Sequence, residues 1–145
     1  TNTAIGSVAH SEQNDLYIFF HNSNNNHFIA RYNSITDKAR VVLKNSLLKF
    51  AKQSFVSGFA VTGNNPSESL LYWTDNINQP RKINVKRAER HTDGDYTNGY
   101  PNPLTEEYVR WVKYPPVNAP TIQHGQDNSI VYNNISTKVF QFCYR

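Results

Sequence analysis

Hydrophobic and polar residues alternate over several short stretches in the first half of the chain. A period of two is typical of β-strands, whose successive side chains point to opposite faces of a sheet. Residues 16–20 are apolar at every position, so we expect a strand that is buried on both faces. Residues 27–33 and 39–44 alternate again, after a polar stretch at 22–26 and a turn at 36–37. This pattern predicts an antiparallel meander with Asn-rich turns.

A second cycle of strands follows the first. Residues 55–62 and 70–75 are the apolar stretches of this cycle. A third stretch, 81–87, alternates, with Ile83 and Val85 on the inner face and Lys82 on the outer face. The two cycles resemble a degenerate internal repeat, although their offset exceeds the ~40–45 residues of a compact propeller blade. We therefore expect residues 1–90 to form a propeller-like β segment.

The character of the sequence changes after this segment. Residues 92–103 are rich in Asp, Gly, Asn, Tyr and Pro, a composition that predicts a loop. Thr105 followed by Glu106 and Glu107 predicts a helix start with a hydroxyl cap and acidic residues in the first turn. That helix must end before the proline pair at 115–116. Residues 91–120 are thus expected to form a loop, one short helix and a Pro-rich connector.

The end of the sequence again has strand-like patterns, at residues 129–132 and 138–144. They predict the start of a further β domain over 121–145, of β-sandwich type and truncated. The sequence has no Met, so we expect it to be a piece of a longer protein. The predicted fold class is all-β, mainly antiparallel, with one short helix.

Composition supports a folded chain with a polar surface. Hydrophobic residues make up only 38% of the sequence, but aromatic residues reach 13%, which argues against disorder. No segment approaches the ~20 apolar residues of a membrane-spanning helix. The single cysteine, Cys143, has no internal disulfide partner and is expected to be a buried, inert thiol.

The sharpest local motif is Tyr72-Trp73-Thr74-Asp75, the tetrapeptide that names the YWTD class of propeller repeats. In such repeats these residues pack between sheets, and the Asp carboxylate fixes a turn. We expect Tyr72, Trp73, Thr74, Asp75, Pro80 and Arg81 to have this architectural role.

A formal net charge of +4 makes nucleic acid a partner to consider. The basic residues Lys82, Lys86, Arg87 and Arg90 are the candidate patch for phosphate. Alternation instead places the lysines on one exposed strand face, where they protect an edge against unwanted pairing. No aromatic residues are interleaved with these charges, as single-strand binding would favour. We expect at most weak proximity to DNA.

Catalytic and metal-binding motifs are missing from the sequence. His91, Asp93 and Asp95 lie close together but match neither an EF-hand loop nor a zinc signature. Glu106 and Glu107 are explained by the first turn of a helix. We therefore expect a protein without enzymatic activity, cofactor or metal.

Four segments carry a resemblance to one protein family: residues 71–85, 94–100, 104–116 and 140–145. In this order they resemble large structural proteins of crAss-like phages of gut Bacteroidetes, the stabilisation or muzzle proteins of the tail. The first segment, LYWTDNINQPRKINV, is the most specific. Members of the family carry a basic residue where this chain has Cys143. The resemblance implies a virion protein of β modules that assembles as a ring and plugs or stabilises the tail channel.

The expected partners are therefore copies of this chain and other virion tail proteins, and the expected location is the phage tail, assembled in the host cytoplasm. Tyr108, Trp111 and Tyr114 are the candidate interface, because aromatics with polar ends are enriched at interfaces. One alternative is a binding module for host surface glycan, with the loop 96–100 as its platform. Another is a hydrolase fragment, whose carboxylates would come from Asp93, Asp95, Glu106 and Glu107.

Overall fold

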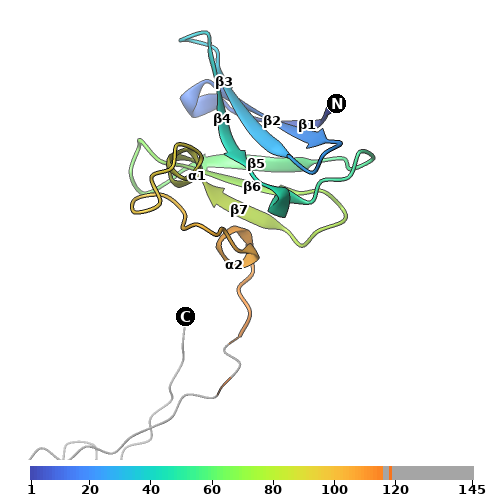
Figure 1. Ribbon diagram of the computed structural model, residues 1–145. Coiled ribbons are helices and arrows are strands. Elements are labelled where there is room, and N and C mark those ends of the chain that lie inside the picture. The colour runs from blue at the N-terminus through green and yellow to red at the C-terminus, as the bar shows by residue number, and fades with distance from the viewer. Residues whose placement is uncertain (116–117, 119–145) are drawn as a thin grey trace, which may run out of the picture. The chain divides into compact units, whose positions relative to one another are not determined.

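The computed structural model describes residues 1–115 and 118 and contains two antiparallel sheets (Figure 1). The first sheet has the order β1 (Asn2–His10), β2 (Asp15–Asn22), β3 (Phe28–Asn33) and β4 (Lys38–Lys44). The second has the order β5 (Ser57–Thr62), β6 (Ser69–Thr74) and β7 (Arg81–Asn84). The helices are α1 (Val85–Thr92) and α2 (Glu106–Val109), with short 3₁₀ turns η1 (Ser11–Gln13) and η2 (Ser46–Leu48). The predicted class, mainly antiparallel β, is confirmed.

The first sheet is the predicted meander, extended by one strand. Asn14, Asn25 and Asp37 take left-handed backbone angles (φ 57°, 60° and 52°) at the three connections. Short polar side chains tolerate this conformation, which explains why Asn and Asp punctuate the meander. β1 precedes the strands that were predicted individually, so the sheet gains an edge strand within the expected β segment.

The predicted strand over residues 81–87 is wrong in its second half. β7 ends at Asn84, and α1 begins at Val85. The Asn84 side chain caps this helix by accepting a hydrogen bond from the backbone N–H of Arg87 (3.0 Å). Burial of Val85, Ala88 and His91 follows a helical spacing on one face. The described chain therefore has two helices where one was expected.

The helix predicted from Thr105 is a single short turn. α2 spans four residues, and Thr105 forms no side-chain cap. Val109 is its buried residue. Immediately after α2 the backbone becomes extended and pairs with β7 through an isolated bridge between Arg81 and Arg110.

The core lies between the inner faces of the two sheets. Phe19 of β2 meets Trp73 of β6 with ring centroids 5.6 Å apart, and Phe50 lies 6.0 Å from Phe19. The two sheets also meet where β1 and β5 come together, because Val56 N–H donates to the Ile5 carbonyl (3.0 Å). Gly6 is required there, since a Cβ on it would lie 2.6 Å from the Val56 oxygen. In Figure 1 the green strands of the second sheet cross below the blue-to-teal strands of the first, with α1 at one end.

Residues Thr1–Tyr114 form one compact unit. Residues 91–114 thus belong to the same unit as the strands. The predicted β domain at 121–145, Cys143 and most of the Pro-rich connector lie outside the described residues.

Candidate functional site

An aromatic pair stands on the outer face of the second sheet. Alternation along β6 turns Trp73 into the core and leaves Tyr72 on the opposite face. The register of β5 and β6 places Phe59 directly opposite Tyr72. Their rings stack with centroids 4.8 Å apart and an interplanar angle of 12°.

Trp111 joins this pair from the far end of the chain. Its backbone N–H donates to the Pro80 carbonyl (3.0 Å), which fixes it beside β7. Its ring lies 5.1 Å from Tyr72 at 64° and 6.2 Å from Phe59 at 73°. The three rings and Pro80 line a hollow of ≈ 370 Å³, with Ser57 and Thr74 as polar wall residues. We call this feature the aromatic groove.

The three predicted interface residues are all exposed, but they do not form one cluster. Trp111 belongs to the aromatic groove, and Tyr114 lies under the Arg110 guanidinium, 3.9 Å from its carbon. Pro80 lines both the aromatic groove and a smaller hollow next to Tyr114, so these two aromatics flank it. Tyr108 instead packs on Tyr100, 6.1 Å away.

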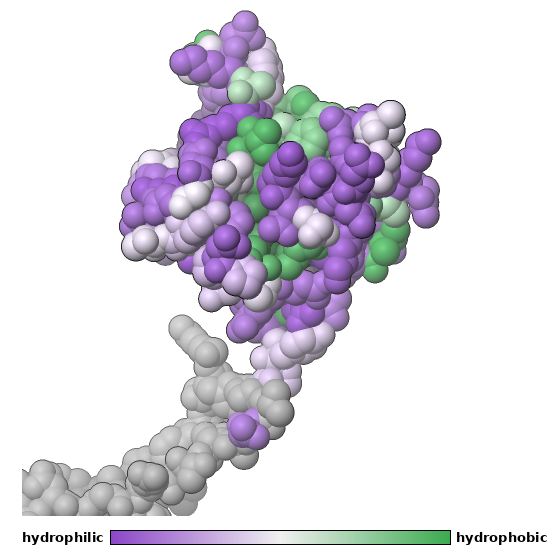
Figure 2. All heavy atoms as spheres, viewed as in Figure 1, coloured by the Kyte–Doolittle hydropathy of each residue, from purple (hydrophilic) through white to green (hydrophobic). Residues whose placement is uncertain are grey.

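A second apolar surface covers the outer side of the first sheet. We call it the outer face; its members are Leu16, Ile18, Phe20, Phe28, Ala30 and Val41. Phe20 and Phe28 stack at 4.6 Å, and Val41 is 37% exposed. The prediction that β2 is buried on both faces is therefore wrong in part: Tyr17 and Phe19 are fully buried, whereas the outer-face residues of β2 are only half-buried. Figure 2 shows hydrophobic residues (green) reaching the surface in patches between hydrophilic side chains (purple).

The YWTD segment closes the turn between β6 and β7. Asp75 is 1% exposed and its carboxylate accepts hydrogen bonds from the backbone N–H groups of Ile77 (3.1 Å) and Asn78 (2.7 Å). Its second oxygen accepts from the Asn78 side chain (2.6 Å). Arg81, also buried, donates to the Leu48 carbonyl (2.6 Å). Burial lowers the pKa of Arg81, while Asp75 and Glu106 act in the opposite direction.

The predicted basic patch does not form a strand edge. Lys82 lies on β7 opposite Tyr72, whereas Lys86, Arg87 and Arg90 lie on α1. Arg87 covers the Tyr100 ring at 4.8 Å, and Arg90 donates to the Asn98 carbonyl (3.4 Å). The two arginines thus fasten the 94–100 loop to α1.

The acidic and His candidates have separate partners. Asp93 pairs with Arg40, and Asp95 accepts from the Asn98 backbone (3.1 Å), a bond that holds the pKa of Asp95 below its usual range. Glu106 pairs with Lys49, and the resulting hydrogen bond lowers the pKa of Glu106. The His91 ring nitrogen Nδ1 lies 3.0 Å from the Tyr100 carbonyl. Within residues 1–115, no three His, Cys, Asp or Glu side chains are grouped as metal ligands.

One partly buried ionic cluster was not predicted from the sequence. Arg31 bridges Glu89 (2.9 Å) and Asp15 (3.5 Å) between the first sheet and α1. Burial raises the pKa of Glu89, and it raises the pKa of the neighbouring Tyr17 to about 12. These residues are far apart in sequence, so no local pattern could have grouped them.

In the described part of the chain, no helix is long and apolar enough to cross a membrane. No protein-family model matches the sequence, and no curated protein and no solved structure matches it.

Proposed function

We propose that this chain is a non-catalytic structural component of a tailed-phage virion. In this proposal it belongs to a tail muzzle or stabilisation protein that assembles as a ring and plugs or stabilises the tail channel. The family resemblance of residues 71–85 suggests the virion, and the geometry suggests how the chain assembles.

The observation that carries the proposal is a pair of apolar surfaces that residues 1–115 leave partly exposed. The outer face of the first sheet and the aromatic groove of the second lie on opposite sides of one two-sheet stack. Exposed apolar patches of this kind usually mark protein interfaces. A chain with two different docking surfaces suits head-to-tail assembly, which closes into a ring when the rotation allows it.

We also propose that the two sheets are successive propeller-like blades. Each is a meander of consecutive antiparallel strands, and the two pack face to face, as blades do. In a propeller the next blade would cover each outer surface. This arrangement accounts for the apolar character of both.

Mass photometry of the full-length parent protein, with virion fractions probed for this segment, tests the proposal. We expect discrete ring-sized oligomers and the segment in mature particles. A monomer that is missing from particles would refute the structural role.

A matched pair of variants tests the outer face itself. Val41→Asp places a charge on the outer face, whereas Ile35→Asp places one at a hairpin tip where the side chain is already 74% exposed. We expect Val41→Asp alone to reduce the oligomer fraction. If both variants assembled to the same extent as the unsubstituted protein, the outer face would be excluded as an interface.

The aromatic groove supports a second candidate, recognition of host surface glycan. Sugar rings stack on exposed aromatic side chains, and Trp111 is 46% exposed beside polar Ser57 and Thr74. Of the platform expected at residues 96–100, Tyr96 is 45% exposed, whereas Tyr100 is only 5% exposed. The test is retention of the chain on host polysaccharide. Loss of retention in Trp111→Ala, with retention preserved in Tyr96→Ala, would favour this function.

A further inference from the structure

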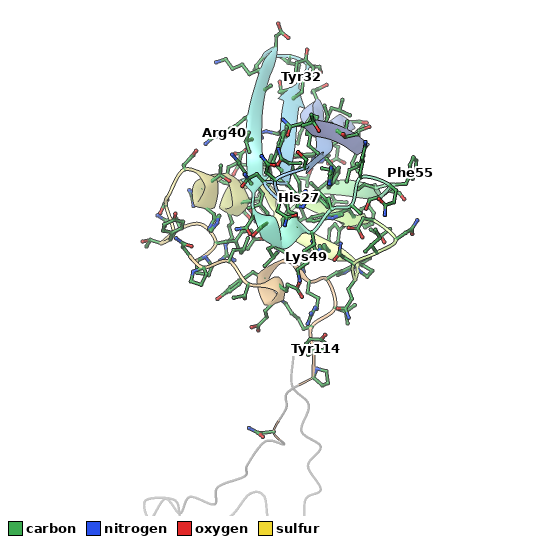
Figure 3. All side chains as sticks on the ribbon, turned by 45° about the vertical axis from the view of Figure 1, so that its right-hand side comes forward. His27, Tyr32, Arg40, Lys49, Phe55 and Tyr114 are labelled. Carbon is green, nitrogen blue, oxygen red and sulfur yellow. The ribbon has the colours of Figure 1, made fainter. Side chains whose placement is uncertain are left out.

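A polar hollow of ≈ 290 Å³ lies on the other side of the Arg110–Trp111 segment from the aromatic groove. Its walls come from three parts of the chain: the end of η2, the turn that Asp75 closes, and α2. The lining side chains that bear on the argument are Lys49, Asn78, Arg81, Glu106 and Arg110. Figure 3 shows Lys49 beside the orange turn of α2. We call this feature the cationic hollow.

Arg81 is an unusual feature of this hollow. It is only 5% exposed, and its hydrogen bond goes to a neutral acceptor, the Leu48 carbonyl (2.6 Å). Within residues 1–115, no carboxylate lies within the 4.0 Å of an ion pair with it. Buried arginines are nearly always paired with a counter-ion. Arg81 is among the residues that line the hollow, and the Leu48 carbonyl is the one hydrogen-bond acceptor of its side chain within residues 1–115.

The two other cations of the hollow share one carboxylate. Glu106 accepts from Lys49 Nζ at Oε1 (2.5 Å) and from Arg110 Nη2 at Oε2 (3.3 Å). Its lowered pKa keeps it ionised at neutral pH. Among the side chains that line the hollow, three cations therefore face one carboxylate. Asp75 also acts favourably on Arg81, but it is not one of the lining residues.

We propose that the cationic hollow is an anion site that receives the carboxylate of an acidic side chain from a partner polypeptide. Glu106 already demonstrates that a carboxylate fits between these cations. Arginine forks match carboxylates with two parallel hydrogen bonds, and Arg81 has donors to spare. The adjoining hollow beside Tyr114 shares Gln79 and Arg110 with this one, so apolar residues next to the acidic group have a surface to meet. The site does not depend on the virion assignment.

Titration of the full chain with sodium acetate, followed by the NMR signals of the arginine Nε–H groups, tests the site. Sodium chloride at equal ionic strength is the reference. We expect a saturating shift of the Arg81 signal with acetate. Arg110→Gln removes one charge-assisted donor and should weaken acetate binding about tenfold. Lys52→Gln, which neutralises an exposed lysine outside the hollow, should leave binding unchanged.

Glu106→Gln provides a sharper test, because it changes binding in the opposite direction. Removing the resident carboxylate frees Lys49 and Arg110, so acetate should bind more tightly than to the parent. A purely structural Glu106 would not produce this gain. Non-saturating shifts, or equal shifts in Arg110→Gln and Lys52→Gln, would overturn the proposal. Saturation by inorganic phosphate and a short oligonucleotide but not by acetate would overturn the carboxylate assignment in favour of a nucleic-acid partner.

Discussion

Replacing Asp75 by Ala tests whether the YWTD carboxylate holds the turn between β6 and β7. The change removes the acceptor for the backbone N–H groups of Ile77 and Asn78 and for the Asn78 amide. It also removes a negative charge that acts favourably on buried Arg81. The fold should remain, because the hydrophobic core does not involve this carboxylate.

The magnitude follows from the three lost hydrogen bonds. A hydrogen bond to a charged group contributes about 1.5–3 kcal/mol, and such contributions do not add when the groups share one acceptor. Asn78 also borders the cationic hollow, where water can replace part of the loss. We therefore expect Asp75→Ala to lower the free energy of unfolding by about 3 kcal/mol. Asp75→Asn keeps a neutral acceptor for the two backbone groups but sets its amide against that of Asn78, so we expect a loss of about 1.5 kcal/mol.

Urea denaturation of the full chain, monitored by tryptophan fluorescence, measures both values. Asp93→Ala is the control, because it removes an exposed carboxylate whose ion pair with Arg40 contributes at most about 1 kcal/mol. The expected order of loss is Asp75→Ala, then Asp75→Asn, then Asp93→Ala. An Asp75→Ala variant as stable as the Asp93→Ala control would show that the turn does not need the carboxylate.

Three further changes test other parts of the fold. Burial raises the pKa of Glu89 above its ordinary 4.5, so the stability linked to its proton is present at low pH and lost as the pH rises through the raised pKa. Glu89→Gln should therefore gain stability relative to the unsubstituted chain as the pH rises above 4.5, and a pH-independent difference would contradict this reasoning. Gly6→Ala should lower the free energy of unfolding by about 1–3 kcal/mol, because the added Cβ crowds Val56. Gly63→Ala should lower it less, because the nearest atom to the added Cβ is 3.3 Å away. Equal losses of stability in thermal unfolding would disprove the packing argument. Trp73→Ala should lower the free energy of unfolding by about 3–5 kcal/mol, because it removes a large buried side chain. Trp73→Phe should lower it by only about 1–2 kcal/mol, because within the described chain the buried Nε1 has no hydrogen-bond partner to lose. A Phe variant as unstable as the Ala variant would indicate a polar role for the indole.

The sequence was sufficient for elements whose pattern is local. Asn and Asp at the turns, and alternation in residues 27–33 and 39–44, predicted the meander because left-handed turn angles and a period of two both act over a few residues. β1 was missed for a specific reason. Its inward residues Ile5 and Val8 are three apart, because a register shift between Ala4 and Gly6 interrupts the alternation.

At the start of α1, the strand period of two and the helical period of 3.6 residues predict the same buried positions over a few residues. Ile83 and Val85 are both buried, which suits a strand through residue 87. The Asn84 cap and the burial of Ala88 and His91 distinguish the helix from a strand. Three residues with good helix propensity, Arg87 to Glu89, were the available sequence signal.

The aromatic groove could not be predicted because it depends on strand register and on a distant segment. The connection between β5 and β6 is six residues long, too long to fix the pairing of Phe59 with Tyr72 by turn geometry. Trp111 was recognised as a candidate contact residue, but its neighbours follow from the bridge between Arg81 and Arg110.

That bridge also explains why an apolar and a cationic site lie side by side. The backbone leaves α2 in an extended conformation, so Arg110 and Trp111 point to opposite sides. Pairing with β7 then places the Arg110 guanidinium in the wall of the cationic hollow and the Trp111 indole in the wall of the aromatic groove. At the start of the paired strand, Pro80 lines the groove and Arg81 lines the hollow in the same way. A partner with an acidic residue next to an aromatic or aliphatic one would contact both sites at once, so substitutions in the two sites should have non-additive effects on its binding.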